Sequence, residues 1–359
     1  MTDLVRADEL RILYVGMAGG VCGMRAEALR SLGHDLVTVP AEVPRGYWRF
    51  QLYRIGSRLG RPPDVLGANR AILRAASRRM FDLLWVDKGR SIRPATLARV
   101  RALHPQSVLV TYSPDDMMNP DNQTAAYLSS IPQYDLHVTT KSYNVPELTE
   151  RGARDAMFVD NAYDPATHRP LPLSAEEKQT YEAEVGFIGG FEEERAREMA
   201  HLAENGVPVT VWGYQWDQLP DRPTALRVVN RRVDGDEYAK AICGAKINLG
   251  FLRKINRDLQ TTRSIEIPAC GAFLLAERTE EHLGLFKEGE EAEFFSTREE
   301  LLQKCRYYLE HDEKRERIAS AGRARCVGDD YSNAGRLREV LNRLQPLLQQ
   351  RGRSKPVTS

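Results

Sequence analysis

The sequence predicts an α/β protein made of two parallel sheets in tandem, each covered by helices on both faces. Short continuous apolar runs alternate with helical patterns in the first half of the chain, which is typical of a parallel sheet. A proline-containing stretch without periodicity, Asp164–Ser174, interrupts the pattern, and a second alternation follows it. The length of 359 residues is enough for about two domains.

In the first half, the strands are expected to be apolar throughout, because both faces of a parallel sheet are buried. They are Arg11–Gly16, Asp35–Val39, Leu83–Asp87, Ser107–Thr111, Leu136–Thr140 and Met157–Val159. The helices expected between them include Met24–Leu32, Pro94–Leu103 and Val145–Glu150. The second of these begins with proline, which suits the first turn of a helix.

The second alternation repeats this design. Its expected strands are Val185–Ile188, Pro208–Trp212, Leu226–Val229, Lys246–Phe251 and Ala272–Ala276, and its helices include Glu192–Ala203, Glu237–Cys243 and Glu299–Leu309. A last helix, Asn333–Leu348, carries leucines at helical spacing that need a surface to cover. The predicted domains are Rossmann-like and span 8–165, with the helix at 333–350, and 175–332. A polar tail at 351–359 is expected to be disordered.

Composition excludes several classes of protein. A net charge of +1 gives no strong field for nucleic acid, and no apolar run approaches the roughly 20 residues that span a bilayer. The first residues lack the apolar core of a signal peptide. Five scattered cysteines without a CxxC pair predict neither a disulfide framework nor a metal site, which favours the cytoplasm. The basic and aromatic residues between 42 and 79 are expected to pack or to face an acceptor, rather than to bind nucleic acid.

Glycine-rich turns follow the first strand of each predicted domain. Gly16, Gly19 and Gly20 are candidates for a phosphate-binding loop before a helix, or they form only a tight connection. Their spacing is not GxGxxG, and no acidic residue ends the second strand, which argues against a dinucleotide. In the second domain, Gly189 and Gly190 open the helix that carries Arg195, which would reach a phosphate or remain a solvated surface residue.

The most informative stretch is 262–276, where a short helix bearing Arg263 and Glu266 ends at a glycine and leads into a buried strand. At the ligand-binding edge of an α/β sheet, the carboxylate would bind ribose hydroxyls and the guanidinium a phosphate. A helix with a surface glutamate and a glycine C-cap is the structural alternative. Asp258 lies eight residues before Glu266. Trp212-Gly213 ends a strand, where the ring would offer a flat surface for a base or simply pack.

These segments resemble the CgeB-like (spore maturation protein-like) glycosyltransferases. The resemblance is strongest from about 185 to 340, including Phe187-Ile188-Gly189-Gly190, Trp212-Gly213 and 262–280. It implies a GT-B fold, with two facing Rossmann-like domains and a final helix that crosses back to the first. It also implies that Glu266 binds the donor ribose and that Arg195 and Arg263 lie near the diphosphate. Asp258 stands where retaining enzymes have a glutamate, so its catalytic role and the stereochemical outcome stay open.

The implied reaction is sugar transfer from a nucleotide-diphospho-sugar, with UDP as the first choice of nucleotide, to an acceptor hydroxyl. Cationic groups and helix N-termini, in place of a metal, would neutralise the leaving group, and no cofactor is expected. If the enzyme inverts, Asp115 or Asp116 would be the general base on the acceptor; the alternative is that the two form a turn pair. Asp87-Lys88-Gly89 is a weaker candidate, and His137 is expected to be a core histidine. The alternatives are a nucleotide-sugar epimerase on the same fold and a non-catalytic binding protein.

Overall fold

The computed structural model describes residues 9–41, 51–52, 55–56, 60 and 62–352. Of the basic and aromatic residues between 42 and 79, those up to residue 61 lie outside this range, as do the first eight residues and those after 352, and so do the predictions made for them. The chain divides into two compact units. Unit 1 holds the residues up to Asp160 together with those from Asn333 onward, and unit 2 holds Asn161–Ser332.

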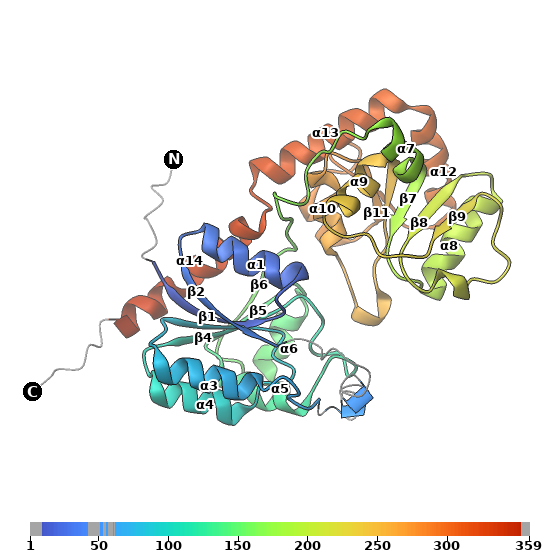
Figure 1. Ribbon diagram of the computed structural model, residues 1–359. Coiled ribbons are helices and arrows are strands. Elements are labelled where there is room, and N and C mark those ends of the chain that lie inside the picture. Colours follow the sequence, from blue (N-terminus) through green and yellow to red (C-terminus); the bar gives the residue numbers. More distant parts are fainter. Residues whose placement is uncertain (1–8, 42–50, 53–54, 57–59, 61, 353–359) are drawn as a thin grey trace, which may run out of the picture. The chain divides into compact units, whose positions relative to one another are not determined.

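Unit 1 is a parallel sheet of six strands in the order β2-β1-β3-β4-β5-β6, with helices on both faces (Figure 1). The strands are β1 Arg11–Gly16, β2 Asp35–Pro40, β3 Leu83–Asp87, β4 Val108–Ser113, β5 Leu136–Thr139 and β6 Ala156–Phe158. The helices are α1 Gly20–Ser31, α3 Ala68–Arg78, α4 Pro94–Leu103, α5 Ala125–Ser130, α6 Asn144–Glu150 and α14 Asn333–Gly352, with a short 3-10 turn at Ile131–Gln133. The predicted α/β class is confirmed here.

The alternation of side chains along β1 explains why the strand is apolar throughout. Ile12 and Tyr14 face the core that α1 and α14 cover, whereas Leu13 and Val15 face the core under α3 and α4. Successive side chains of a strand point to opposite faces, so a strand covered on both sides needs an apolar residue at every position.

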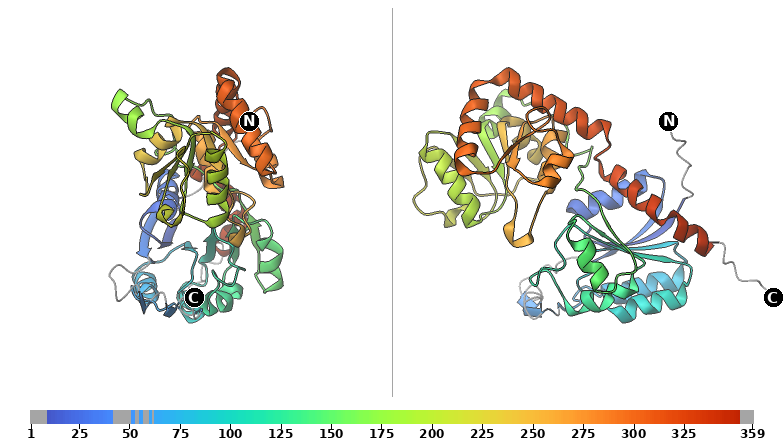
Figure 2. Two further views of the ribbon diagram at one scale, coloured as in Figure 1. Left: turned by 90° about the vertical axis from the view of Figure 1, so that its right-hand side faces the viewer. Right: turned by 180° about the vertical axis from the view of Figure 1, so that it is seen from behind.

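Helix α14 belongs to unit 1, where it packs beside α1 (Figure 2). Its buried apolar side chains are Leu337, Val340, Leu341 and Leu344. Helix α14 continues to Gly352, two residues beyond the end predicted for it. The Arg351 guanidinium binds the Asp135 carboxylate at 2.7 and 2.8 Å and so holds the last turn of the helix on the sheet.

Unit 2 is a second parallel sheet of six strands, in the order β12-β11-β10-β7-β8-β9. The strands are β7 Ala183–Ile188, β8 Val209–Trp212, β9 Leu226–Val229, β10 Ala245–Gly250, β11 Leu274–Glu277 and β12 Glu293–Phe295. The helices are α7 Ala175–Tyr181, α8 Glu193–Glu204, α9 Asp236–Gly244, α10 Thr262–Ala269, α11 Glu280–Leu285, α12 Arg298–Glu310 and α13 Asp312–Gly328, with 3-10 turns at Trp216–Gln218 and Lys254–Asn256. Residues of α8 and α12 line one core and residues of α9 and α10 another.

The stretch Asp164–Ser174 contains neither helix nor strand, as predicted for a linker, but it is part of unit 2. His168 within it is only 3 % exposed. Just before it, the Asn161 backbone N–H donates a hydrogen bond to the buried Gln260 side chain at 3.0 Å. The segment therefore contributes side chains to the interior of unit 2.

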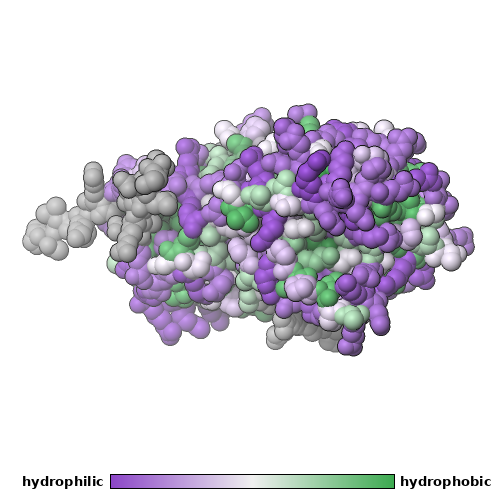
Figure 3. Space-filling model, turned by 90° about the horizontal axis from the view of Figure 1, so that it is seen from above, coloured by the Kyte–Doolittle hydropathy of each residue, from purple (hydrophilic) through white to green (hydrophobic). Residues whose placement is uncertain are grey.

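The surface seen in Figure 3 is mainly hydrophilic, with hydrophobic residues in small scattered groups. None of the helices in the described part of the chain is long and apolar enough to cross a membrane. All five cysteines are free thiols.

Candidate functional site

The carboxyl ends of the unit 2 strands meet at one edge of the sheet, because all the strand pairs are parallel. This edge carries the turn after β7, the loop 251–261 after β10 and Glu277 at the end of β11. Open α/β sheets bind ligands at this edge. The sequence-predicted residues Gly189, Gly190, Arg195, Arg263 and Glu266 all belong to elements that begin here.

The turn Gly189–Gly190 rests on the backbone of Gly213. The Gly189 N–H donates to the Trp212 carbonyl at 2.9 Å, and the Gly189 carbonyl accepts from the Trp216 indole at 2.8 Å. A Cβ atom on Gly213 would lie 1.9 Å from the Gly189 oxygen. Gly213 is therefore required for the close approach of two backbones that shapes the turn.

Replacing Gly213 with alanine is expected to push the Gly189–Gly190 turn away and to destabilise the protein by about 1–3 kcal/mol, as overpacking does. Urea denaturation measures the loss. Gly190→Ala is the matched control, because a Cβ there meets nothing within 4 Å. Equal stability of the two variants would contradict the assigned role of Gly213.

The prediction that the Trp212 ring would offer a surface for a base is wrong. Its ring is 1 % exposed and packs in a small core with Tyr181, Val233 and Ala241. It therefore offers no flat surface for a base. Tyr214, two residues further on, is 57 % exposed and is the accessible aromatic ring at this strand end.

Three arginine side chains converge behind the turn. Arg195, in the first turn of α8, is buried, lies over the Phe187 ring and pairs with Glu192 at 2.9 Å. Burial, together with the nearby positive charges of Arg263 and Arg253, lowers the pKa of Arg195 to about 10, against the opposing effect of Glu192. The Arg263 Nε atom is buried without a hydrogen-bond partner in the described part of the chain. The region is therefore suited to an anion.

Glu266 lies on α10, one helical turn beyond Arg263, and is 6 % exposed. The Tyr238 hydroxyl donates to its Oε2 atom at 2.5 Å. Burial and the Glu266 carboxylate raise the pKa of Tyr238 well above its usual value, so the phenol stays a donor. The Nδ1 atom of His168 accepts a hydrogen bond from the Asp164 backbone N–H, so the ring hydrogen is on Nε2. This Nε2 atom lies 3.6 Å from Glu266 Oε1.

His282 holds the start of α10 against the end of β11. Its Nδ1 atom lies 2.6 Å from the Glu277 carbonyl, which can only accept, so the hydrogen is on Nδ1. Nε2 therefore accepts from the Ser264 hydroxyl at 2.7 Å. Because Ser264 is next to Arg263, this histidine positions the helix that carries both Arg263 and Glu266.

Acidification is expected to destabilise the fold through His282 and His137. Burial lowers the pKa of each to about 4, against about 6.5 in an unfolded chain. Below pH 6.5 the unfolded state binds these protons first, so stability falls as the pH drops from 6.5 toward 4, by about 2 kcal/mol per histidine at pH 5. Urea titrations at pH 7 and 5 measure it. The pH effect should shrink in His282→Gln but not in a variant of the exposed His311.

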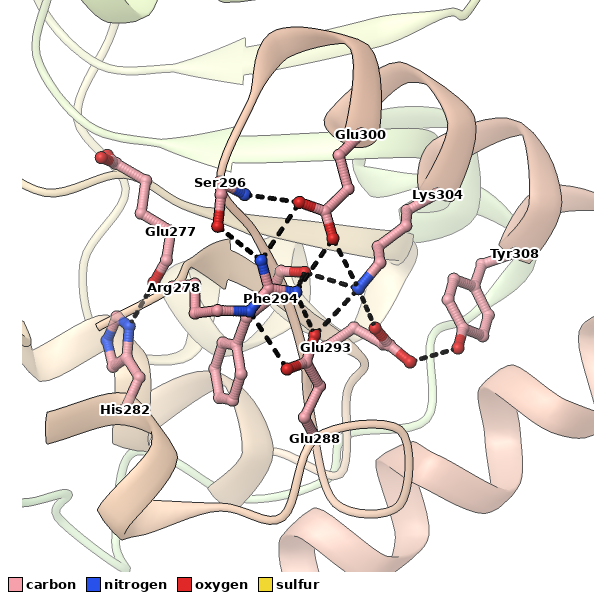
Figure 4. Close-up of polar contacts among 10 residues, drawn as sticks. All are labelled: Glu277, Arg278, His282, Glu288, Glu293, Phe294, Ser296, Glu300, Lys304 and Tyr308. Atoms are coloured by element: carbon pink, nitrogen blue, oxygen red, sulfur yellow. Dashed lines mark hydrogen bonds and ion pairs between the residues drawn. The ribbon is translucent and has the colours of Figure 1, made fainter. Parts of the chain in front are cut away.

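Glu277 ends β11 and points away from a neighbouring ion network (Figure 4). Its Oε1 atom accepts the Leu252 N–H at 2.8 Å, and burial raises the pKa of this carboxyl. Arg278 and Lys304 instead bind Glu288, Glu293 and Glu300, which join β11 and β12 to α12. A pocket of about 160 Å³ lies at this edge; its lining includes Arg195, Phe251, Lys254, Glu277, Thr297 and Arg298.

Asp258 stabilises the loop that carries Arg253. Its Oδ1 atom accepts from the Asn256 side-chain amide at 2.7 Å, and its Oδ2 atom is 3.4 Å from the Arg253 backbone nitrogen. The residue is 9 % exposed. These contacts give Asp258 a positioning role within the loop 253–258.

In unit 1, the glycine turn after β1 borders a pocket of about 360 Å³, lined among others by Gly16, Gly19, Gly20, Glu27, Arg30 and Thr38. Beneath it, Asp87 is buried and accepts hydrogen bonds from Arg25 at 3.1 Å and from Tyr14. A Cβ on Gly16 would lie 3.2 Å from that of Asp87. Asp87 therefore packs directly against Gly16 at the start of the glycine turn.

The two candidate bases after β4 differ in accessibility. Asp116 is fully buried, and its Oδ1 atom accepts from the Met118 N–H at 3.0 Å and from Asn144 at 2.9 Å, as in a turn. Asp115 is about one-third exposed and pairs with Lys88 at 2.5 Å. Lys88 has a φ of 61°, a strained conformation that is enriched at functional sites. The geometry favours Asp115 over Asp116 for contact with a ligand.

Four contributors to the unit 2 site were not predicted from the sequence: Glu192, Tyr238, His168 and Arg253. Tyr238 lies 28 residues from Glu266, and Arg253 lies 61 residues from Glu192. No local pattern marks such pairs, because the fold alone brings them together.

Comparison with known proteins shows which folds and families the chain resembles. Residues 194–342 match a family model described as glycosyl transferase-like, and no curated protein matches the chain. Among solved structures, the chain is similar to HepE of Anabaena in complex with UDP and glucose, with 12% identity, a TM-score of 0.61 and coverage of 94% of this chain and 100% of that one.

Two further structures are similar. The sucrose-phosphate synthase of Thermosynechococcus elongatus has 11% identity and a TM-score of 0.64, with 94% of this chain and 100% of that chain covered. A putative UDP-N-acetylglucosamine 2-epimerase of Listeria monocytogenes has 11% identity and a TM-score of 0.52, with 93% and 95% covered. At these identities the likeness establishes the fold, which is that of the GT-B glycosyltransferases.

Proposed function

We propose that the protein is a glycosyltransferase that moves a sugar from a nucleotide-diphospho-sugar, with a UDP-sugar favoured, to an acceptor hydroxyl without a metal ion. The observation that carries the proposal is a group of three arginines at the carboxyl edge of unit 2. Arg195 and Arg253 share the Glu192 carboxylate, and Arg263, whose charge acts on Arg195, lies one helical turn from the Glu266 carboxylate. An anion site beside a buried carboxylate matches a diphosphate joined to a ribose.

The proposed catalysis rests on stabilising the negative charge of the leaving group. Departure of the nucleoside diphosphate builds negative charge on the distal phosphate, which the three guanidinium groups would stabilise. Glu266, held by Tyr238, would accept hydrogen bonds from the ribose hydroxyls. Asp115, next to Lys88, is our candidate for the base that accepts the proton of the acceptor hydroxyl.

The glycosyl transferase-like match over 194–342 supports this proposal, and UDP complexes of the similar HepE favour a uridine donor. The residues at 262–280 resemble the CgeB-like subfamily, which we propose as the closer affiliation. The five free thiols suit a reducing compartment, and we propose the cytoplasm.

The test is a thermal-shift series with UDP, GDP, ADP, dTDP, CDP and NAD, each with and without EDTA. A ligand at about 100 times its Kd adds about 2.7 kcal/mol to stability. Stabilisation by one nucleoside diphosphate that EDTA leaves unchanged is the expected result. A response to NAD alone, or to no diphosphate, would contradict the proposal.

Incubation with the UDP-sugar alone separates the proposed transferase from an epimerase, the alternative that the Listeria structure illustrates. A transferase leaves the donor sugar with its configuration unchanged until an acceptor is added. A new nucleotide-sugar isomer formed without an acceptor would favour the epimerase. NMR of the sugar protons distinguishes the two outcomes.

A further inference from the structure

We propose that Glu192 acts as an internal competitor for the donor phosphates and so sets the affinity of the site for nucleoside diphosphates, an inference that rests on the proposed function. Its two carboxylate oxygens are bound by two different arginines. Oε2 pairs with Arg195 at 2.9 Å and Oε1 with Arg253 at 2.8 Å. The carboxylate therefore joins two of the three guanidinium groups that would otherwise face a phosphate.

Glu192 occupies the N-cap position of α8 but does not cap the helix. It is the residue that precedes the first helical residue of α8, yet its side chain makes no capping hydrogen bond. In the same unit, Ser174, Thr279 and Thr297 occupy this position of other helices and accept a backbone N–H of the first turn. Glu192 thus leaves the start of α8 without a side-chain cap and directs its charge to the arginines.

The two partners differ in how firmly they are held. The Arg195 side chain is 5 % exposed, whereas the Arg253 and Glu192 side chains are 52 % and 36 % exposed. Glu192 and Arg253 can therefore turn outward while Arg195 stays in place.

The consequence is an exchange of anions. A diphosphate must take the place of the Glu192 carboxylate on Arg195 and Arg253, so part of the binding free energy is spent on breaking two ion pairs. The same carboxylate can return to the arginines when the nucleoside diphosphate leaves, which favours product release. Removing its charge should tighten diphosphate binding.

The experiment compares Glu192→Gln with Glu193→Gln by isothermal titration with UDP and with inorganic pyrophosphate. Both variants lose one negative charge, but Glu193 is exposed and pairs with Arg197 on the helix surface. We expect Glu192→Gln to bind both ligands about three- to tenfold more tightly, and tenfold corresponds to about 1.4 kcal/mol of binding free energy. We expect no change in affinity for Glu193→Gln. In an Arg253→Gln background, the gain from Glu192→Gln should be smaller.

Unchanged or weaker binding by a folded Glu192→Gln protein, as judged by circular dichroism, would overturn the inference, since Glu192 would then only position Arg195. If UDP binds the wild type but Glu192→Gln is no tighter, the proposed function stands and this inference fails. If no nucleoside diphosphate binds while Glu192→Gln gains affinity for pyrophosphate, the donor assignment fails and the competitor role stands.

Discussion

Glu266→Gln is expected to weaken UDP binding by about 10- to 100-fold. Loss of a charge-assisted hydrogen bond costs about 1.5–3 kcal/mol, and about 1.4 kcal/mol corresponds to tenfold in affinity. Glutamine keeps the shape of the side chain and an oxygen that accepts from Tyr238, so the fold should persist. Isothermal titration with UDP measures the effect, and urea denaturation measures the stability of the variant.

Tyr238→Phe is the matched control for this prediction. It removes the hydrogen bond at 2.5 Å but leaves the carboxylate charge for the ribose. We expect a smaller loss of affinity than for Glu266→Gln. Equal affinity of wild type and a folded Glu266→Gln protein would remove Glu266 from the donor site and leave it as a buried carboxylate that Tyr238 satisfies.

Arg25→Met is expected to give the largest loss of stability, about 3–5 kcal/mol, which is the cost of breaking a buried ion pair. The Arg25 and Asp87 side chains are 6% and 1% exposed, so the substitution leaves an uncompensated charge in the core of unit 1. Urea denaturation provides the free energy of unfolding. The double variant Arg25→Met/Asp87→Asn should recover part of the loss, because it also removes the charge.

Arg30→Met on the same helix is the control. Arg30 pairs with Glu27 in solvent, with side chains 42% and 74% exposed, and such pairs contribute about 0–1 kcal/mol. Losses of similar size in the two single variants would mean that the Asp87 cluster does not hold unit 1 together.

Elements with a strong local signal could be predicted from the sequence. The observed bounds of β1, β3 and β9 equal the predicted ones, because each is a short run rich in leucine and valine between clear breaks. The edge strand β12 was missed because three residues carry no periodicity. Helix α13 was missed because its buried positions include Arg315, Ala319 and Gly322, which do not mark an apolar face.

Some residues of the candidate site could be proposed from the sequence and others could not. Arg195, Arg263 and Glu266 follow directly from their places after strands, so the sequence indicated them. Trp212 could not be assigned from sequence, because a ring at the end of a strand can face either the core or the solvent. Tyr238 and Arg253 depend on contacts between distant elements, which no single sequence window contains.

The position of α14 has a consequence for the order of folding during synthesis. Leu337, Val340, Leu341 and Leu344 complete the core over Ile12 and Trp85, yet they are made more than 300 residues after β1 begins. Unit 2 is continuous in the chain, from Asn161 to Ser332, and all of its residues leave the ribosome before α14 does. The first unit to be translated is therefore the last to close its core, and its uncovered sheet face is the part of the nascent chain most in need of a chaperone.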